Sequence, residues 1–196
     1  QGVFAACAQH LIDNKYTAQP RLAIQGGSNG GLLTLATGIQ RPDLFGAIVS
    51  EVPVTDMNRF HVGSFFGYSW KGDYGDPGIK ADFNRAAKYS PYHNVAKGFT
   101  HPPILINTDA NDDRVMPWHS YKMTALLQSR EAKSSVTVMK VALNGGHGGG
   151  GSIRLRFEST ATVFSFLERT LGPINQRAYK ANITPVARAV ATQRKR

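Results

Sequence analysis

Short apolar runs alternate along this chain with longer segments in which apolar residues recur at helical spacing. The short runs are rich in apolar or β-branched residues, and they predict strands at 21–25, 47–52, 103–108 and 135–143. The periodic segments predict helices at 1–14, 30–40, 117–129 and 152–172, the last of which ends at Gly172 and Pro173. Strands that alternate with helices in this way are typical of an α/β fold with parallel strands and flanking helices.

Two segments interrupt the alternation. Residues 58–100 are rich in glycine and aromatic side chains, and we expect this insert to cover one end of the sheet. Residues 145–152 read GGHGGGGS, which suits either a flexible linker or a polar loop that carries one histidine. We favour the loop, because the run lies between a predicted strand and a predicted helix.

The length of 196 residues and the apolar fraction of 41% suit one domain with a sizeable core. The net charge is +10, and six basic residues but no acidic residue follow Asn175. We therefore assign a folded domain to 1–175 and a solvated basic tail to 176–196. No basic patch is interleaved with aromatic residues, so we expect no nucleic-acid partner.

Cysteine content and hydropathy bear on the compartment. Cys7 is the single cysteine, so no disulfide can form within the chain and an oxidising compartment is not implied. Cys7 lies in an apolar stretch, which predicts a buried structural thiol. No run approaches the ~20 apolar residues that span a bilayer, and no charged segment precedes an apolar one as in a signal peptide. We expect a cytoplasmic protein without a membrane partner.

The segment RLAIQGGSNGGLL joins a predicted strand to a predicted helix and contains the pattern G-x-S-x-G at 26–30. In that context the pattern indicates a nucleophile elbow, a sharp turn that lifts a serine hydroxyl clear of the sheet. Ser28 would be the nucleophile, and the Asn29 N–H would face the oxyanion that forms during acyl transfer. A glycine-rich turn without chemistry is the alternative, because short Gly/Ser runs recur by chance.

An elbow serine needs a histidine base and a carboxylate that orients it, in the order Ser, Asp, His. His147 follows the last predicted strand and, among glycines, has no apolar face to pack. Asp112 follows the strand at 103–108, with Asp109 and Asp113 as competitors on spacing alone. No histidine and cysteine cluster has metal-ligand spacing, so no metal is expected.

Six short motifs occur in order along the chain: GGSNGGLL, RPDLFGA, WKGDYG, YSPYHNV, NDDRV and GGHG. Together they closely resemble the prolyl oligopeptidase family of serine peptidases, over about residues 7–171. The resemblance implies an α/β-hydrolase fold, no cofactor, and cleavage of short peptides on the carboxyl side of proline. By position it assigns the triad to Ser28, Asp112 and His147, with NDDRV selecting Asp112, and it assigns a backbone oxyanion donor to Asn29.

The resemblance also implies a substrate pocket. The matching positions are Trp70 and Tyr74 for an aromatic side that stacks the substrate proline, Val54 and Val115 for aliphatic walls, Phe66 for further lining, and Arg114 for a hydrogen bond to the substrate backbone. Such a slot suits proline, whose ring is flat, apolar and without an N–H. Without the family, Arg114 could equally be a surface arginine paired with Asp113, and Trp70 could pack in the core.

The sequence departs from the family pattern in two ways. Family members carry an upstream propeller and the first strands of the hydrolase sheet, whereas the four predicted strands here correspond to its second half. The upstream tyrosine that supplies the family's second oxyanion donor has no matching position. We therefore expect an N-terminally incomplete catalytic domain, weak or unstable alone, with the missing part of the same protein as its partner.

Two alternatives to a proline-specific peptidase stay open. A sister oligopeptidase or dipeptidyl peptidase would share the machinery but prefer another side chain. The segment SEVPVTDMNRFH drifts toward relatives that cleave after basic residues, and Glu51 is the acidic residue that could bind such a side chain. The other alternative is a catalytically weak fragment that acts as a binding or structural piece. The intact triad argues against that fragment, and the missing upstream half argues for it.

Overall fold

A computed structural model describes residues 2–148 and 152–172. The described residues form a four-stranded parallel sheet in the order β1 (Ala23–Gly27), β2 (Ala47–Glu51), β3 (Ile104–Asp109) and β4 (Thr137–Ala142). The α-helices are α1 (Gly2–Asp13), α2 (Asn29–Gln40), α3 (Phe65–Ser69), α4 (Lys71–Tyr74), α5 (Lys80–Ala87), α6 (Trp118–Arg130) and α7 (Ile153–Leu171). Short 3₁₀ turns are η1 (Gln19–Arg21), η2 (Pro42–Leu44) and η3 (Pro91–His93). The predicted parallel α/β architecture is confirmed.

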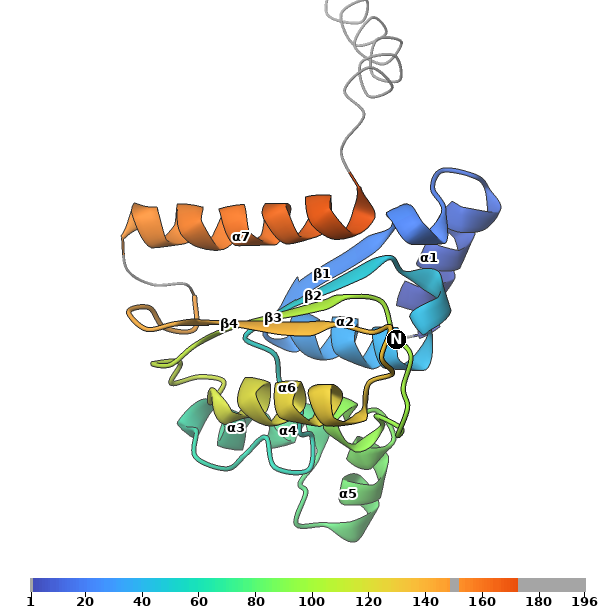
Figure 1. The fold of residues 1–196 in the computed structure, drawn as a ribbon. Helices are drawn as coiled ribbons and strands as arrows, with labels where there is room; N and C mark the ends of the chain where they lie inside the picture. The colour runs from blue at the N-terminus through green and yellow to red at the C-terminus, as the bar shows by residue number, and fades with distance from the viewer. Residues whose placement is uncertain (1, 149–151, 173–196) are drawn as a thin grey trace, which may run out of the picture.

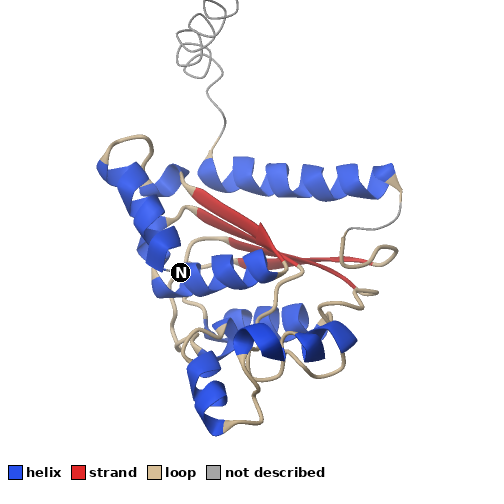
Figure 2. Ribbon diagram, turned by 180° about the vertical axis from the view of Figure 1, so that it is seen from behind, coloured by secondary structure: helices blue, strands red, loops and turns tan. Residues whose placement is uncertain are grey.

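Helices cover both faces of the sheet. In Figure 1, α7 lies along one face, and α2 and α6 lie along the other; the view from behind in Figure 2 shows the same layers. None of the described helices is long and apolar enough to cross a bilayer. The expected basic tail at 176–196 lies outside the described residues, so the boundary at 175 stays a prediction.

Two covered faces explain why the strands read as continuous apolar runs. Successive residues of β3 serve opposite faces. Ile104 and Ile106 join the core beneath α2 and α6, whereas Leu105 packs with Val163 of α7. All six residues of β3 are buried, and its backbone groups pair with β2, β4 and the residues that flank them, such as Val52 and Val136.

The helix α2 approaches the sheet closely because glycines lie at its contact points. A Cβ atom at Gly38 would overlap the Ile48 side chain, and one at Gly31 would overlap the ring and backbone of Pro53. Leu35 of α2 is fully buried in the same core. This tight seat fixes the start of α2, and therefore the turn that precedes it.

The insert at 58–100 reaches the carboxyl ends of the strands, where the Tyr74 hydroxyl donates to Asn29 and the Ser64 hydroxyl donates to the Arg114 carbonyl. Its helices α3, α4 and α5 form a further layer beyond α2 and α6, on the side away from α7 (Figures 1 and 2). The 3₁₀ turn η3 contacts both α2 and α6. Trp70 and Tyr74 of the insert pack against a cluster that includes Leu32 of α2 together with Val54 and Val115, which lie in the segments after β2 and β3.

Cys7 is exposed, so the predicted buried thiol is wrong. Helix α1 packs on the core through Phe4, Ala5, Ala8 and Ile12. That stripe is rotated from the one that includes Cys7, which places Cys7 on the solvent side of the helix.

Replacing the buried Phe45 tests the core beneath α2. Phe45 has no exposed surface, so Phe45→Ala should cost about 3–5 kcal/mol of unfolding free energy through the cavity that it leaves. Urea denaturation of the purified protein measures this. Phe65→Ala is the matched control, because Phe65 is 84% exposed and its loss should change stability by no more than about 0.5 kcal/mol. Equal effects of the two substitutions would contradict the assignment of the core.

Candidate active site

Ser28 lies in the turn between β1 and α2, with φ 59° and ψ −118°. A non-glycine residue adopts a positive φ only when its surroundings enforce it. Here the Ser28 N–H donates to the Glu51 carbonyl at 2.8 Å, and the Ser28 carbonyl accepts from Gly31 and Leu32 of α2. A Cβ atom at Gly26 would overlap the Gly30 carbonyl group. The elbow is therefore held by backbone contacts on both sides of the serine.

The glycines of the G-x-S-x-G pattern do not have equal roles. Gly26 leaves room for the chain to turn back on itself, as its overlap with Gly30 shows. A Cβ atom at Gly30 would meet nothing within 4 Å. The tight turn thus requires a glycine at position 26, whereas a side chain at position 30 would face open space.

Three side chains from three strand ends meet at the elbow. His147 Nε2 lies 2.9 Å from Ser28 Oγ, and His147 Nδ1 lies 2.9 Å from Asp112 Oδ2. Ser28 follows β1, Asp112 follows β3, and His147 follows β4. Because parallel strands end at the same edge of the sheet, residues 119 positions apart in the chain come into hydrogen-bond contact.

The Asp112 carboxylate is fully buried and fixed by the backbone. Its Oδ1 atom accepts the N–H groups of Arg114 at 3.0 Å and Val115 at 2.9 Å, while His147 Nδ1 lies 2.9 Å from Oδ2 and 3.1 Å from Oδ1. The competing aspartates lie differently. Asp113 is exposed, and Asp109 accepts the Asn111 N–H at 2.8 Å. Of the three aspartates, the structure brings Asp112 to the histidine.

Asn29 is the first residue of α2. N–H groups in the first turn of a helix have no intrahelical acceptor and lie at the positive end of the helix dipole. The Asn29 N–H follows Ser28 directly, so it is available to an anion that forms on an atom bonded to Ser28 Oγ.

Apolar side chains next to the elbow form a cluster. Its buried members are Leu32, Val54, Met57, Phe60, Ala86 and Val115, and Trp70, Tyr74 and Tyr89 pack against it. The structure therefore brings together four of the five expected pocket residues. The other expected apolar residue, Phe66, is 38% exposed, and the Arg114 guanidinium lies over its ring, 4.9 Å from the ring centre.

Arg114 is exposed and lies over an aromatic face rather than in an ion pair with Asp113. Its carbonyl accepts the Ser64 hydroxyl at 2.8 Å, and Ser64 in turn caps α3 by accepting the Gly67 N–H. The loop after β3 is thus tied to the helix that carries Phe66, while no hydrogen bond to another described residue occupies the guanidinium N–H groups.

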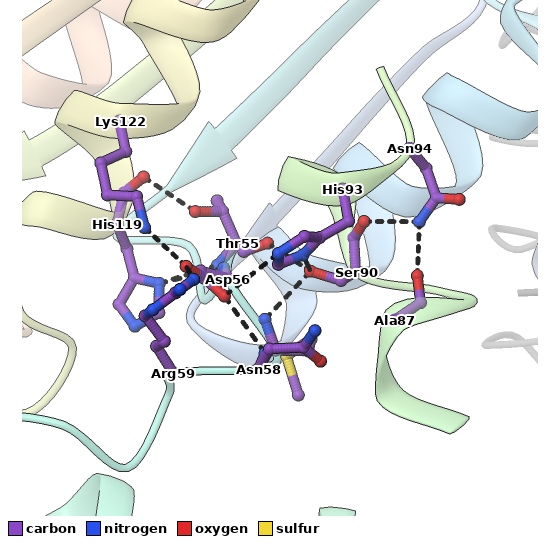
Figure 3. A network of polar contacts seen from close by, with 11 residues as sticks. Thr55, Asp56, Asn58, Arg59, Ala87, Ser90, His93, Asn94, His119 and Lys122 are labelled. Carbon is purple, nitrogen blue, oxygen red and sulfur yellow. Dashed lines mark hydrogen bonds and ion pairs between the residues drawn. The ribbon is translucent and has the colours of Figure 1, made fainter. Parts of the chain in front are cut away.

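Behind the pocket lies a buried polar network, drawn in Figure 3. Asp56 has no exposed side-chain surface and pairs with Lys122 of α6 and with Arg59. Burial alone would raise the pKa of Asp56, but the hydrogen bond and charge of Lys122, together with the nearby His93 and Arg59, hold that pKa below its ordinary value. Thr55 and Asp56 both donate their backbone N–H groups to His119 Nδ1 at 3.2 Å.

His119 is an acceptor in this network. Burial lowers the pKa of His119 from 6.5 to about 3, so the ring is neutral near pH 7 and can accept both N–H groups. These bonds hold the chain from Pro53 to Asn58, a stretch in which every residue is buried. Val54 belongs to that stretch, so α6 positions one wall of the pocket through the network.

A cavity of about 610 Å³ lies on the other side of the sheet, between the strand ends and α7. Its lining includes Glu51, Asn107, Lys140, His147 and Glu158. Glu51 accepts from Gln25 at 3.0 Å and lies within 3.5 Å of the Asn107 amide. Glu51 therefore belongs to the α7 face, whereas Trp70 belongs to the cluster on the α2 face.

A family model described as the prolyl oligopeptidase family matches residues 4–173. The chain belongs to the prolyl oligopeptidase family. It is 42% identical over 172 residues to prolyl oligopeptidase ophP of Omphalotus olearius, a match that covers 86% of this chain and 23% of the relative. The chain thus spans about a quarter of the length of the curated relatives that it matches.

Solved structures give the same result for the fold. A prolyl endopeptidase matches with a TM-score of 0.82 and 40% identity over 86% of this chain and 25% of that one. Oligopeptidase B from Leishmania major matches with a TM-score of 0.80 and 26% identity, over 86% and 23% of the two chains. The fold of this family member is therefore that of an α/β-hydrolase catalytic domain, as expected.

Sequence reasoning missed the polar network of this prolyl oligopeptidase family member. Asp56 and His119 belong to no motif. Their roles arise because the fold buries them against each other, although they lie 63 positions apart in the chain. A weak signal exists, because two charged residues, Asp56 and Lys122, occur in segments that are otherwise apolar or uncharged. Among the described residues, no group of three or more histidine, cysteine or carboxylate side chains is arranged to hold a metal ion.

The neutral state of His119 predicts a pH dependence of stability. Its folded pKa is depressed, so the unfolded chain binds more protons below pH 6.5, and stability falls as pH drops from 6.5 toward 3. His119→Asn keeps an acceptor for the two N–H groups but cannot titrate. We expect the variant to lose less unfolding free energy than the parent between pH 7 and pH 4 in urea denaturation. The exposed His10→Asn control should follow the parent; a parallel loss in His119→Asn would contradict the assignment.

Proposed function

We propose that this chain carries the catalytic machinery of a serine peptidase that hydrolyses peptide bonds on the carboxyl side of proline. The observation that carries the proposal is the hydrogen-bonded chain Ser28–His147–Asp112, with 2.9 Å on each side of the imidazole. Ser28 is the nucleophile, His147 the general base, and Asp112 the residue that orients it. Short peptides are the proposed substrates; the cytoplasmic location remains a prediction.

The reaction follows from the geometry. Ser28 Oγ attacks the carbonyl carbon of the residue before the scissile bond, and its proton passes to His147 Nε2. The Asp112 carboxylate stabilises the resulting imidazolium through Nδ1. The Asn29 N–H donates to the tetrahedral oxyanion. His147 then gives the proton to the leaving amine as the peptide bond breaks. In the second half, His147 takes a proton from water, whose oxygen attacks the acyl carbonyl, and gives that proton to Ser28 Oγ as the ester bond breaks.

Specificity for proline is proposed from the apolar cluster beside the elbow. Trp70 and Tyr74 offer aromatic surface, and the buried Val54 and Val115 close the slot. A charged side chain would have no partner there. Glu51, considered as a partner for a basic side chain, is bonded to Gln25 on the α7 face. The higher identity to a prolyl endopeptidase than to oligopeptidase B points in the same direction.

Removing the nucleophile tests the proposed reaction. Ser28→Ala should abolish peptidase activity and labelling by a fluorophosphonate, with melting behaviour unchanged, because only one half-exposed hydroxyl is lost. His147→Ala should lower the rate by a similar factor, since members of one catalytic unit are not additive. Ser129→Ala, an exposed serine of α6, is the control. Stoichiometric labelling of Ser28→Ala would show that another serine is the nucleophile.

Removing an aromatic ring tests the pocket. Trp70→Ala should lower kcat/KM for a proline substrate more than for the matching alanine substrate, by about five-fold or more, since an aromatic platform contributes about 1 kcal/mol beyond area burial. Tyr16→Ala is the control, because Tyr16 is 75% exposed and follows α1, away from the cluster, so the proline-to-alanine ratio should stay unchanged. Equal losses on both substrates in Trp70→Ala would mean that Trp70 supports the fold rather than the pocket.

A further inference from the structure

One hydrogen bond at the site has no role in the reaction described above. The Tyr74 hydroxyl donates to Asn29 Oδ1 at 2.7 Å. The proposed function uses the ring of Tyr74 in the pocket and the backbone N–H of Asn29 at the oxyanion. The bond instead joins the Tyr74 hydroxyl to the Asn29 side-chain amide. It thus links the end of α4 to the start of α2, which lie 45 positions apart in the chain.

Tyr74 is held in place by its packing and by the end of α4. Its ring packs edge-on against the buried Phe60, with centres 5.3 Å apart and planes at 72°. The next residue, Gly75, ends α4 at φ 89°, where the Asp82 carboxylate accepts the Asp76 N–H at 2.8 Å. Burial raises the pKa of Tyr74, reinforced by Tyr89 and Asp73, so the hydroxyl remains a donor through neutral pH.

Asn29 is not fixed in other ways. Its side chain is exposed, and among the described residues the Tyr74 hydroxyl is the only hydrogen-bond partner of its amide. A hollow of about 380 Å³ lies beside it, lined by Asn29, Gly30, Leu32, Leu33 and Tyr89. Gly30 puts no side chain into this space. Without the Tyr74 hydroxyl, the Asn29 side chain has room to turn away.

We propose that the Asn29 side chain and the Tyr74 hydroxyl are a positioning pair that links the substrate pocket to the oxyanion donor. The proposal rests on the proposed function. Asn29 follows a residue held in a strained turn, so a restraint on its side chain also restrains the peptide plane whose N–H meets the oxyanion. The ring of Tyr74 packs against the apolar cluster of the proposed substrate pocket. Binding of substrate in that pocket and alignment of the Asn29 N–H therefore both depend on the position of Tyr74.

The test is a double-mutant cycle in the purified protein with a proline amide substrate. Tyr74→Phe keeps the ring and removes the hydroxyl; Asn29→Ala removes the acceptor. Each should lower kcat about five- to ten-fold with KM nearly unchanged. The double variant should be no slower than the slower single variant. The rate of phosphonylation at Ser28 should fall by the same factor, because the phosphonyl oxygen occupies the oxyanion position.

Other outcomes overturn the proposal. Losses that multiply in the double variant, a change confined to KM, or a Tyr74→Phe variant with the parental kcat would each show that the bond does not position the donor. Tyr92→Phe, a half-buried tyrosine at η3, is the control and should keep the parental kcat. Thermal melting separates misfolding from a local effect. If the parent protein is not phosphonylated at Ser28, the proposed function is overturned as well. If the parent is labelled normally and the Tyr74 and Asn29 variants keep the parental rates, only the pairing is overturned.

Discussion

The site depends on one strained turn, the passage of the chain from β1 into α2 through Ser28. A positive φ at a serine is unfavourable by itself, so the neighbouring structure must hold it there. Three features do so. The Ser28 N–H donates to the end of β2, Gly26 leaves space for the turn, and Gly31 packs closely against Pro53. The turn is therefore as stable as the packing of α2 on the sheet.

A second strained residue supports the first. Val52, directly after β2, has φ 41°, a value that a β-branched residue rarely adopts. Its N–H donates to the Asn107 carbonyl at 2.7 Å, which continues the strand pairing for one residue while the chain already bends away. The bend carries Pro53 toward Gly31 and Val54 toward the pocket. Strain at Val52 and Ser28 is thus stored on neighbouring strands at the same edge of the sheet.

Much of this arrangement could be predicted from the sequence. Period and composition gave the four strands, the main helices and their parallel order, because buried strands of a parallel sheet are continuous apolar runs. The motifs indicated which loops meet at the sheet edge, and the structure brings Ser28, Asp112 and His147 into contact there. Their catalytic roles stay proposals, as does the use of the pocket.

The failures have physical causes. Cys7 was misplaced because one turn of apolar helix offers several candidate stripes, and only the partner surface selects among them. The helices within 58–100 were not predicted, because α3, α4 and α5 have too few turns to show a period. The neutral His119 and the paired Asp56 were missed, because burial of a polar group depends on distant chain segments and leaves only a weak local signal.

The polar network behind the pocket has a consequence for protein engineering. Pro53 to Asn58 keep their path through bonds to His119 and Lys122, and none of these bonds involves Trp70. The backbone segment that presents Val54 and the Trp70 ring beside it are therefore held by different contacts. A library that varies the side chain at position 70 could sample new substrate preferences while the backbone that presents Val54 stays in place.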